Sequence, residues 1–150
     1  MAETNDLDKV DLTFPSLLDY IGLVNAVTEE IGDHLGLDEE ERDAVSNSVV
    51  EACTNAIEHG NKLDRSKNVL VRFRTAPGRI EIGVSDQGEG FDPQGIQDPR
   101  TPENLMRERG RGIFILRAFM DEVRYEFGPD WGTTVWMVKR LSGKPGRNGN

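Results

Sequence analysis

The alternation of apolar side chains between residues 69 and 84 constrains the fold of this chain more than any other feature. Two short segments carry an apolar residue at every second position, first Val69, Val71 and Phe73, and then Ile80, Ile82 and Val84. Residues 76–79 read Ala-Pro-Gly-Arg, which is typical of a tight turn. The pattern predicts two neighbouring strands that share one buried face and are joined as a hairpin.

Two amphipathic helices are predicted before this hairpin. Apolar residues spaced by three or four indicate a first helix from Leu17 to Leu35, and Gly36 is expected to end it. Asp38 is the expected N-cap of the second helix, with Glu41 three residues later in a capping-box arrangement. The apolar stripe of that helix continues to about residue 60. A short strand is predicted ahead of both helices, because apolar residues alternate between positions 10 and 14.

The remaining segments complete the predicted architecture. Residues 87–111 are rich in Gly and Pro and show no regular period, which in a compact domain is more often functional than accidental. A helix is predicted over 112–120, and two strands follow at 123–127 and 133–138. This order predicts an α+β fold, a two-layer sandwich in which helices cover one face of a mixed, mostly antiparallel sheet.

We expect one domain with two irregular ends. The domain is predicted over residues 10–141, after a flexible N-terminus at 1–9 and before a disordered tail at 142–150, where no large apolar side chain occurs.

Composition excludes several classes of protein. The 150 residues include 18 Lys or Arg against 27 Asp or Glu, a net charge of −9, which argues against holding nucleic acid or an anionic membrane by bulk electrostatics. No run of 18 apolar residues and no signal-peptide pattern occurs, so a cytoplasmic protein is expected. The lone Cys53 cannot form an intrachain disulfide, and with two His a structural zinc site is not expected.

Polar residues on the second predicted helix form the first candidate site. Glu51, Asn55 and His59 are four residues apart, so they project from one stripe beside the apolar one. One interpretation is a solvated polar face, as most such stripes are. The other is a site in which the Asn oxygen meets a hard cation and the Glu serves as a base one turn away.

A carboxylate at the end of the hairpin is the second candidate. Asp86 continues the parity of the buried positions, so its side chain should point to the same face, where an unsatisfied carboxylate is costly. Gly88 and Gly90 would let a ligand approach the backbone closely. The alternative is that Asp86 accepts hydrogen bonds within its own turn.

Two glycine-containing segments near the predicted strands and helix are the third and fourth candidates. Residues 109–112 read Arg-Gly-Arg-Gly directly before a helix, where free N–H groups and the helix dipole favour an anion. The alternative is an ordinary joint between a loop and a helix. Four arginines between 100 and 111 form a basic island in this acidic chain. Gly132-Thr133-Thr134 opens the last predicted strand and, taken alone, indicates only a turn and a β-branched strand start.

Taken in order, these segments resemble the N, G1, G2 and G3 boxes of the GHKL ATPases over about residues 10–140. The matching segments are Glu51-x-x-x-Asn55, Asp86-x-Gly88-x-Gly90, Gly110-x-Gly112 and Gly132-Thr133. The phrases EACTNAIEHGNK and GRGIFILRAFMDEV are similar to the RsbW/SpoIIAB branch of that superfamily, small bacterial anti-sigma factors that are also serine/threonine protein kinases. No P-loop pattern is present.

The resemblance implies a role for each matching residue. Asn55 would hold Mg²⁺ on the ATP phosphates, and Glu51 would orient or deprotonate the attacking hydroxyl. Asp86 would receive the adenine amino group, assisted by Thr133 through a ring nitrogen and a bound water. The remaining cofactor-binding residues expected are Gly88 and Gly90 beside the base, Gly110 and Gly112 at the lid, and Arg109 or Arg111 as a phosphate contact. His59 is expected either near phosphate or as a helix C-terminal residue that the dipole favours.

The resemblance also implies partners and leaves alternatives open. The expected partners are an antagonist protein as phosphorylation substrate and a sigma factor, with a homodimer as the assembly and no direct contact to nucleic acid or membrane. One alternative is an ATP-binding switch without phosphoryl transfer, which the presence of Glu51 disfavours. A detached histidine-kinase ATPase domain is also disfavoured, because both His residues lie within the ATPase pattern.

Overall fold

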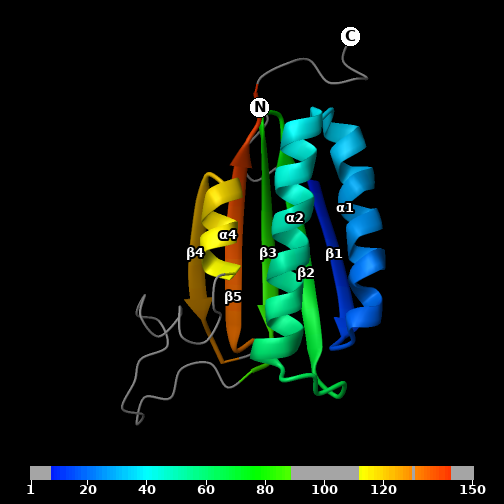
Figure 1. Cartoon of the computed structure of the whole chain (residues 1–150), viewed down its shortest axis with the longest axis vertical. Coiled ribbons are helices and arrows are strands. Elements are labelled where there is room, and N and C mark those ends of the chain that lie inside the picture. Colours follow the sequence, from blue (N-terminus) through cyan, green and yellow to red (C-terminus); the bar gives the residue numbers. More distant parts are fainter. Residues whose placement is uncertain (1–7, 89–111, 130, 143–150) are drawn as a thin grey trace.

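The computed structural model describes residues 8–88, 112–129 and 131–142, which form a two-layer α+β sandwich (Figure 1). One layer is a five-stranded sheet with strand order β1-β2-β3-β5-β4. The strands are β1 (Asp8–Pro15), β2 (Asn68–Ala76), β3 (Arg79–Asp86), β4 (Glu122–Phe127) and β5 (Thr133–Arg140). All four pairings among them are antiparallel.

The second layer consists of helices on one face of the sheet. The helical elements are η1 (Leu18–Tyr20), α1 (Ile21–Leu35), α2 (Glu39–Asn55), η2 (Ala56–Gly60) and α4 (Gly112–Phe119). Figure 1 shows α1 beside β1, α2 over the middle of the sheet and α4 over β5 and β4. The predicted α+β sandwich with helices on one face is therefore confirmed, although the sheet formed by the described strands is antiparallel throughout and not mixed. The predicted flexible N-terminus at 1–9 is wrong for Asp8 and Lys9, which begin β1 and pair with Thr75 and Arg74 of β2. Residues 1–7 and 143–150 lie outside the described residues, so the rest of the two predicted flexible ends stays a prediction.

The core lies between the two layers and follows the predicted alternation. The side chains predicted to share the buried face of the hairpin are all at most 2% exposed. Helix residues Val24, Val45 and Val49 pack against them, with Leu116 from α4 and Met137 from β5. Since burying each such side chain contributes roughly 1.5–3 kcal/mol, this shared face holds the helices on the sheet.

The first helix begins later than its apolar spacing predicts. Leu17 has an extended backbone, with φ −125° and ψ 129°, and the η1 turn precedes the start of α1 at Ile21. The reason lies just upstream, where the Ser16 N–H and hydroxyl both donate to the Lys67 carbonyl oxygen, at 3.1 Å and 2.7 Å. These hydrogen bonds keep the backbone extended through Ser16, so the helix cannot begin there. At its other end α1 stops as predicted, at a left-handed Gly36.

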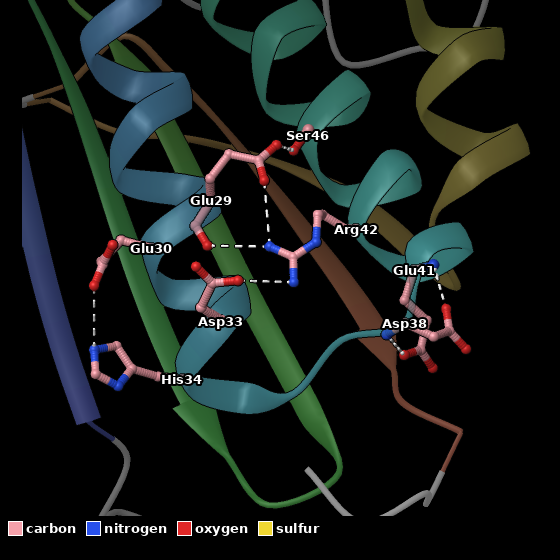
Figure 2. A network of polar contacts seen from close by, with 8 residues as sticks. All are labelled: Glu29, Glu30, Asp33, His34, Asp38, Glu41, Arg42 and Ser46. Atoms are coloured by element: carbon pink, nitrogen blue, oxygen red, sulfur yellow. Dashed lines mark hydrogen bonds and ion pairs between the residues drawn. The ribbon is translucent and has the colours of Figure 1, made fainter. Parts of the chain in front are cut away.

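The second helix begins with the predicted capping box. Asp38 Oδ1 accepts a hydrogen bond from the Glu41 N–H at 2.7 Å, and Glu41 Oε1 accepts one from the Asp38 N–H at 3.0 Å (Figure 2). Glu41 Oε2 also accepts from the N–H of Ser142, 101 residues later, at 2.6 Å. The N-terminus of α2 is thereby tied to the chain that leaves the last strand.

An arginine between α1 and α2 sets the relative position of the two helices. Arg42 of α2 reaches Asp33 at 2.9 Å and both the side chain and carbonyl oxygen of Glu29, at 3.2 Å and 3.3 Å (Figure 2). Its side chain is only 17% exposed. A Cβ on Gly32 would lie 3.2 Å from the guanidinium, so the glycine makes room for it. We call Arg42 with its two acidic partners the Arg42 clamp.

Replacing Arg42 with alanine should lower the free energy of unfolding by about 2 kcal/mol, because charge-assisted hydrogen bonds in a partly buried site are lost. Urea denaturation followed by circular dichroism measures this. The matched control is Arg79→Ala, since the Arg79 side chain is 46% exposed and its pair with Glu81 spans 3.5 Å. That control should change stability by less than about 0.5 kcal/mol. Equal effects of the two substitutions would contradict the clamp.

Candidate functional site

Asp86 lies at the end of the central strand β3 and is buried. It is 2% exposed and points to the helix-covered face, as its parity predicts. Its neighbours across the sheet are Val69 on β2 and Thr133 on β5. Asp86 Oδ1 accepts a hydrogen bond from the Gly88 N–H at 2.9 Å, so part of the predicted turn interaction is present. A buried carboxylate with donors directed at it is a preformed acceptor for a further N–H group.

Three glycines allow separate chain segments to crowd around this carboxylate. A Cβ added to Gly60 would lie closer than 3.0 Å to the carboxylate oxygens of Asp86. A Cβ added to Gly88 would likewise lie closer than 3.0 Å to the carbonyl oxygen of Gly60, and a Cβ added to Gly132 closer than 3.0 Å to the carbonyl oxygen of Gly88. The Gly132 N–H also donates to the Asp86 carbonyl oxygen at 2.8 Å. Close packing therefore requires glycine at all three positions, and Gly60 was not among the residues predicted for the site.

Glu51 and Asn55 converge on the beginning of α4. A Cβ on Gly112 would lie 2.5 Å from Glu51 Oε2 and 2.5 Å from Asn55 Nδ2. Asn55 is only 6% exposed, whereas Glu51 is half-buried. The predicted pair on one helical stripe is therefore brought together with the predicted glycine, although these residues are far apart in the sequence.

A small pocket that is partly open to solvent lies between the C-terminal end of α2, the end of β3 and the beginning of β5. It contains three of the predicted site residues, Asn55, Asp86 and Thr133. Its other lining residues are apolar or aromatic: Ala52, Ala56, Val84, Leu116, Tyr125 and Val135. Few polar groups on apolar walls are the usual composition of a small-molecule site. The alternation in 123–127 and 133–138 could have indicated Tyr125 and Val135, which share the buried face.

A π-helical turn follows α2 and breaks the predicted stripe. The N–H of Asn61 donates to the carbonyl oxygen of Ala56, five residues earlier, at 2.8 Å. The sequence predicts instead one continuous helix to residue 60. Because the wider turn changes the phase of the helix, His59 becomes exposed and does not line the pocket, while Gly60 comes to lie against Asp86.

Four predicted site residues cannot be placed. Gly90, Arg109, Gly110 and Arg111 lie outside the described residues, so the predicted phosphate contacts of the glycine-rich segment stay predictions.

Other chemistry is limited within the described part of the chain. Burial raises the pKa of the Cys53 thiol to about 12, so this thiol stays protonated and is a poor nucleophile. Residues 8–88, 112–129 and 131–142 contain no cluster of three or more His, Cys, Asp or Glu that could hold a metal ion. Among the helices of the described ranges, none has both the length and the apolar character of a membrane span.

Comparisons of the sequence with known proteins found relatives that span most of the chain. A family profile described as the histidine kinase-like ATPase domain matches residues 14–139. The serine-protein kinase RsbW of Bacillus subtilis (strain 168) is 33% identical over 146 residues, covering 93% of this chain and 90% of that protein.

Solved structures show the same fold. The RsbU and RsbW domains of a Mycobacterium tuberculosis protein superpose with a TM-score of 0.64 at 20% identity, covering 89% of this chain and 32% of that one. The catalytic domain of the histidine kinase ThkA superposes with a TM-score of 0.53 at 13% identity, covering 89% of this chain and 96% of that one.

Gly60→Ala should lower the free energy of unfolding by about 1–3 kcal/mol, because the added methyl group must displace a buried carboxylate. Chemical denaturation of the purified variant gives the value. Gly22→Ala is the matched control, since a Cβ there meets nothing within 4 Å. At that exposed helical position alanine should leave stability unchanged or raise it by up to about 1 kcal/mol. A Gly60 variant as stable as the control would mean that Asp86 is not confined as described.

Proposed function

The chain belongs to the histidine kinase-like ATPase domain family and, within it, to the RsbW serine-protein kinases, and on that basis we propose that it is a protein kinase and anti-sigma factor. In this proposal it transfers the terminal phosphoryl group of ATP to a serine or threonine of an antagonist protein. It also sequesters a sigma factor, and phosphorylation of the antagonist leaves it free to do so. The observation that carries the proposal is the convergence of Glu51 and Asn55 on Gly112, with Asn55 and Asp86 in one pocket.

Adenine recognition is assigned to the buried end of β3. The carboxylate of Asp86 accepts a hydrogen bond from the exocyclic amino group of the base, and Thr133, opposite it on β5, assists. Guanine carries a carbonyl oxygen where adenine carries that amino group, so two acceptors would face each other. Burial makes such a mismatch costly, which supports selectivity for ATP over GTP.

The donor set fits Mg²⁺ bound together with phosphates. The side-chain oxygen of Asn55 is a hard ligand, and Mg²⁺ commonly takes one or two protein oxygens and completes its shell with phosphate oxygens and water. A dedicated carboxylate cluster is therefore not required. When bound, Mg²⁺ would neutralise charge on the phosphates.

Glu51 is assigned to the attacking hydroxyl. It lies one helical turn before Asn55, so the residue that handles the nucleophile and the residue that positions the phosphates share one rigid helix. The hydroxyl proton passes to the Glu51 carboxylate while the hydroxyl oxygen bonds to the γ-phosphorus. The bond from that phosphorus to the bridging oxygen breaks, and ADP leaves.

The charge distribution is consistent with binding to proteins rather than to DNA. Residues 16–60, which include helices α1 and α2, contain eleven Asp or Glu and a single Lys or Arg, Arg42. This acidic segment suits a basic surface on the sigma factor and repels nucleic acid. Under the proposal the protein works in the bacterial cytoplasm as a homodimer.

Asn55→Ala should abolish Mg²⁺-dependent ATP binding, since the oxygen that would meet the cation is lost. Isothermal titration with ATP, with and without Mg²⁺, measures the effect. Asn47→Ala on the exposed side of the same helix is the control and should bind as the parent does. Tight binding of MgATP by the Asn55 variant would remove this residue from the site.

Glu51→Ala should keep ATP affinity within about threefold of the parent and reduce phosphoryl transfer by at least about a hundredfold, in the range expected for loss of a general base. The assay incubates the protein with labelled ATP, Mg²⁺ and the protein encoded by the neighbouring gene as candidate antagonist. Glu40→Ala, an exposed carboxylate on α2, is the control. Equal transfer by both variants would exclude Glu51 from the reaction, and ATP binding with no transfer even by the parent would favour the ATP-binding switch.

A further inference from the structure

Asn61 is a fully buried polar residue directly after the glycine that packs on Asp86. It is 0% exposed, and its side chain uses the amide oxygen and both amide hydrogens. Oδ1 accepts from the Gln87 N–H at 2.7 Å. Nδ2 donates to the Asn68 carbonyl oxygen at 2.9 Å and to Ser16 Oγ at 2.7 Å. A buried amide whose hydrogen bonds are all made holds the backbone around it rigidly.

These hydrogen bonds connect the ends of three strands. Ser16 follows β1, Asn68 opens β2 and Gln87 follows β3. Gln87 closes the network, because its side-chain oxygen accepts from the Asn68 N–H at 2.6 Å. Strand ends beyond their ladder normally fray, and here one side chain replaces the missing ladder bonds.

The same side chain fixes the backbone on both sides of the Asp86 carboxylate. On one side Asn61 follows Gly60, whose backbone packs against the carboxylate. On the other side, Asn61 Oδ1 accepts the hydrogen bond of the Gln87 N–H. Gln87 connects Asp86 to Gly88, whose N–H donates to Asp86 Oδ1. Moving Asn61 would therefore shift the backbone of Gly60 and of Gln87, on the two sides of the Asp86 carboxylate.

The backbone after Asn61 is strained, which shows how firmly this point is held. Lys62 and Leu63 have positive φ angles of 54° and 62°, and neither is glycine. Two consecutive left-handed residues persist only where the surrounding structure over-determines them, and such strain clusters at functional sites. The Asn61 bonds and the bond from the Leu63 N–H to the Ile57 carbonyl oxygen, at 2.8 Å, supply that constraint.

We propose that Asn61 is a positioning residue for base selectivity, acting through Asp86 by holding Gly60 and Gln87 on either side of its carboxylate. The inference rests on the proposed function, because it takes Asp86 as the adenine acceptor. Asn61 itself does not touch the nucleotide. A residue that served stability alone would change the unfolding midpoint without changing the preference for one base over another.

The test measures ATP and GTP affinities, with Mg²⁺ present, for the parent and for Asn61→Ala, Asp86→Asn and the double variant. Asn61→Ala should weaken ATP binding by about tenfold and lower the ratio of ATP to GTP affinity. In the Asp86→Asn background the same substitution should change the ratio by less than about twofold, because the two residues act as one unit. Asn61→Ser, whose shorter side chain cannot reach both Gln87 and Asn68, is measured if the alanine variant does not fold.

Ser16→Ala is the matched control, since it removes a partner from the same network but leaves the bond to Gln87 in place. It should lower the unfolding midpoint and leave the affinity ratio unchanged. An Asn61 variant that loses stability but keeps the parent's ratio, or an undiminished effect in the Asp86→Asn background, would overturn the inference while the proposed function stands. Unchanged ATP affinity in Asp86→Asn alone would instead overturn the adenine assignment, and the inference with it.

Discussion

The arrangement of the site depends on a carboxylate that is buried at the end of the central strand and needs hydrogen-bond donors around it. Leaving such a group without partners inside a protein costs several kcal/mol. The structure directs the Gly88 N–H at Asp86 and brings the backbone of Gly60 against it. These backbone segments lie too close together to leave room for a side chain. Glycine is therefore needed here because of the close packing around the carboxylate, and not because the chain must be flexible.

Helix α2 links that buried group to the rest of the chemistry. Its apolar side, including Val45 and Val49, belongs to the core, while its C-terminal turns carry Glu51 and Asn55. The Arg42 clamp fixes the helix against α1, and the capping box fixes its beginning. Any displacement of α2 would therefore disturb the core and the site together. The distances between the polar groups of the site thus depend on how α2 packs in the domain.

The sequence predicted most of this fold because the periodicities are strong. Alternation identified the hairpin, and the burial of Asp86 followed from its parity with Ile80, Ile82 and Val84. Local signals were less reliable where tertiary bonds compete with them. The first helix begins at Ile21 because Ser16 is held by Lys67, and the second helix widens into a π turn after Asn55. Lys67 lies 51 residues after Ser16, and no local pattern marks it as the partner.

The fold class, the capped beginning of α2 and the four polar and glycine-containing segments can all be predicted from the amino-acid sequence, because each depends on local spacing and residue type. How these segments meet depends on the packing of the whole domain. This packing placed Gly112 between Glu51 and Asn55, moved His59 out to the surface and Gly60 onto Asp86, and made Asn61 the junction of three strand ends. These outcomes depend on contacts between residues up to dozens of positions apart, which form only when the helical layer packs on the sheet.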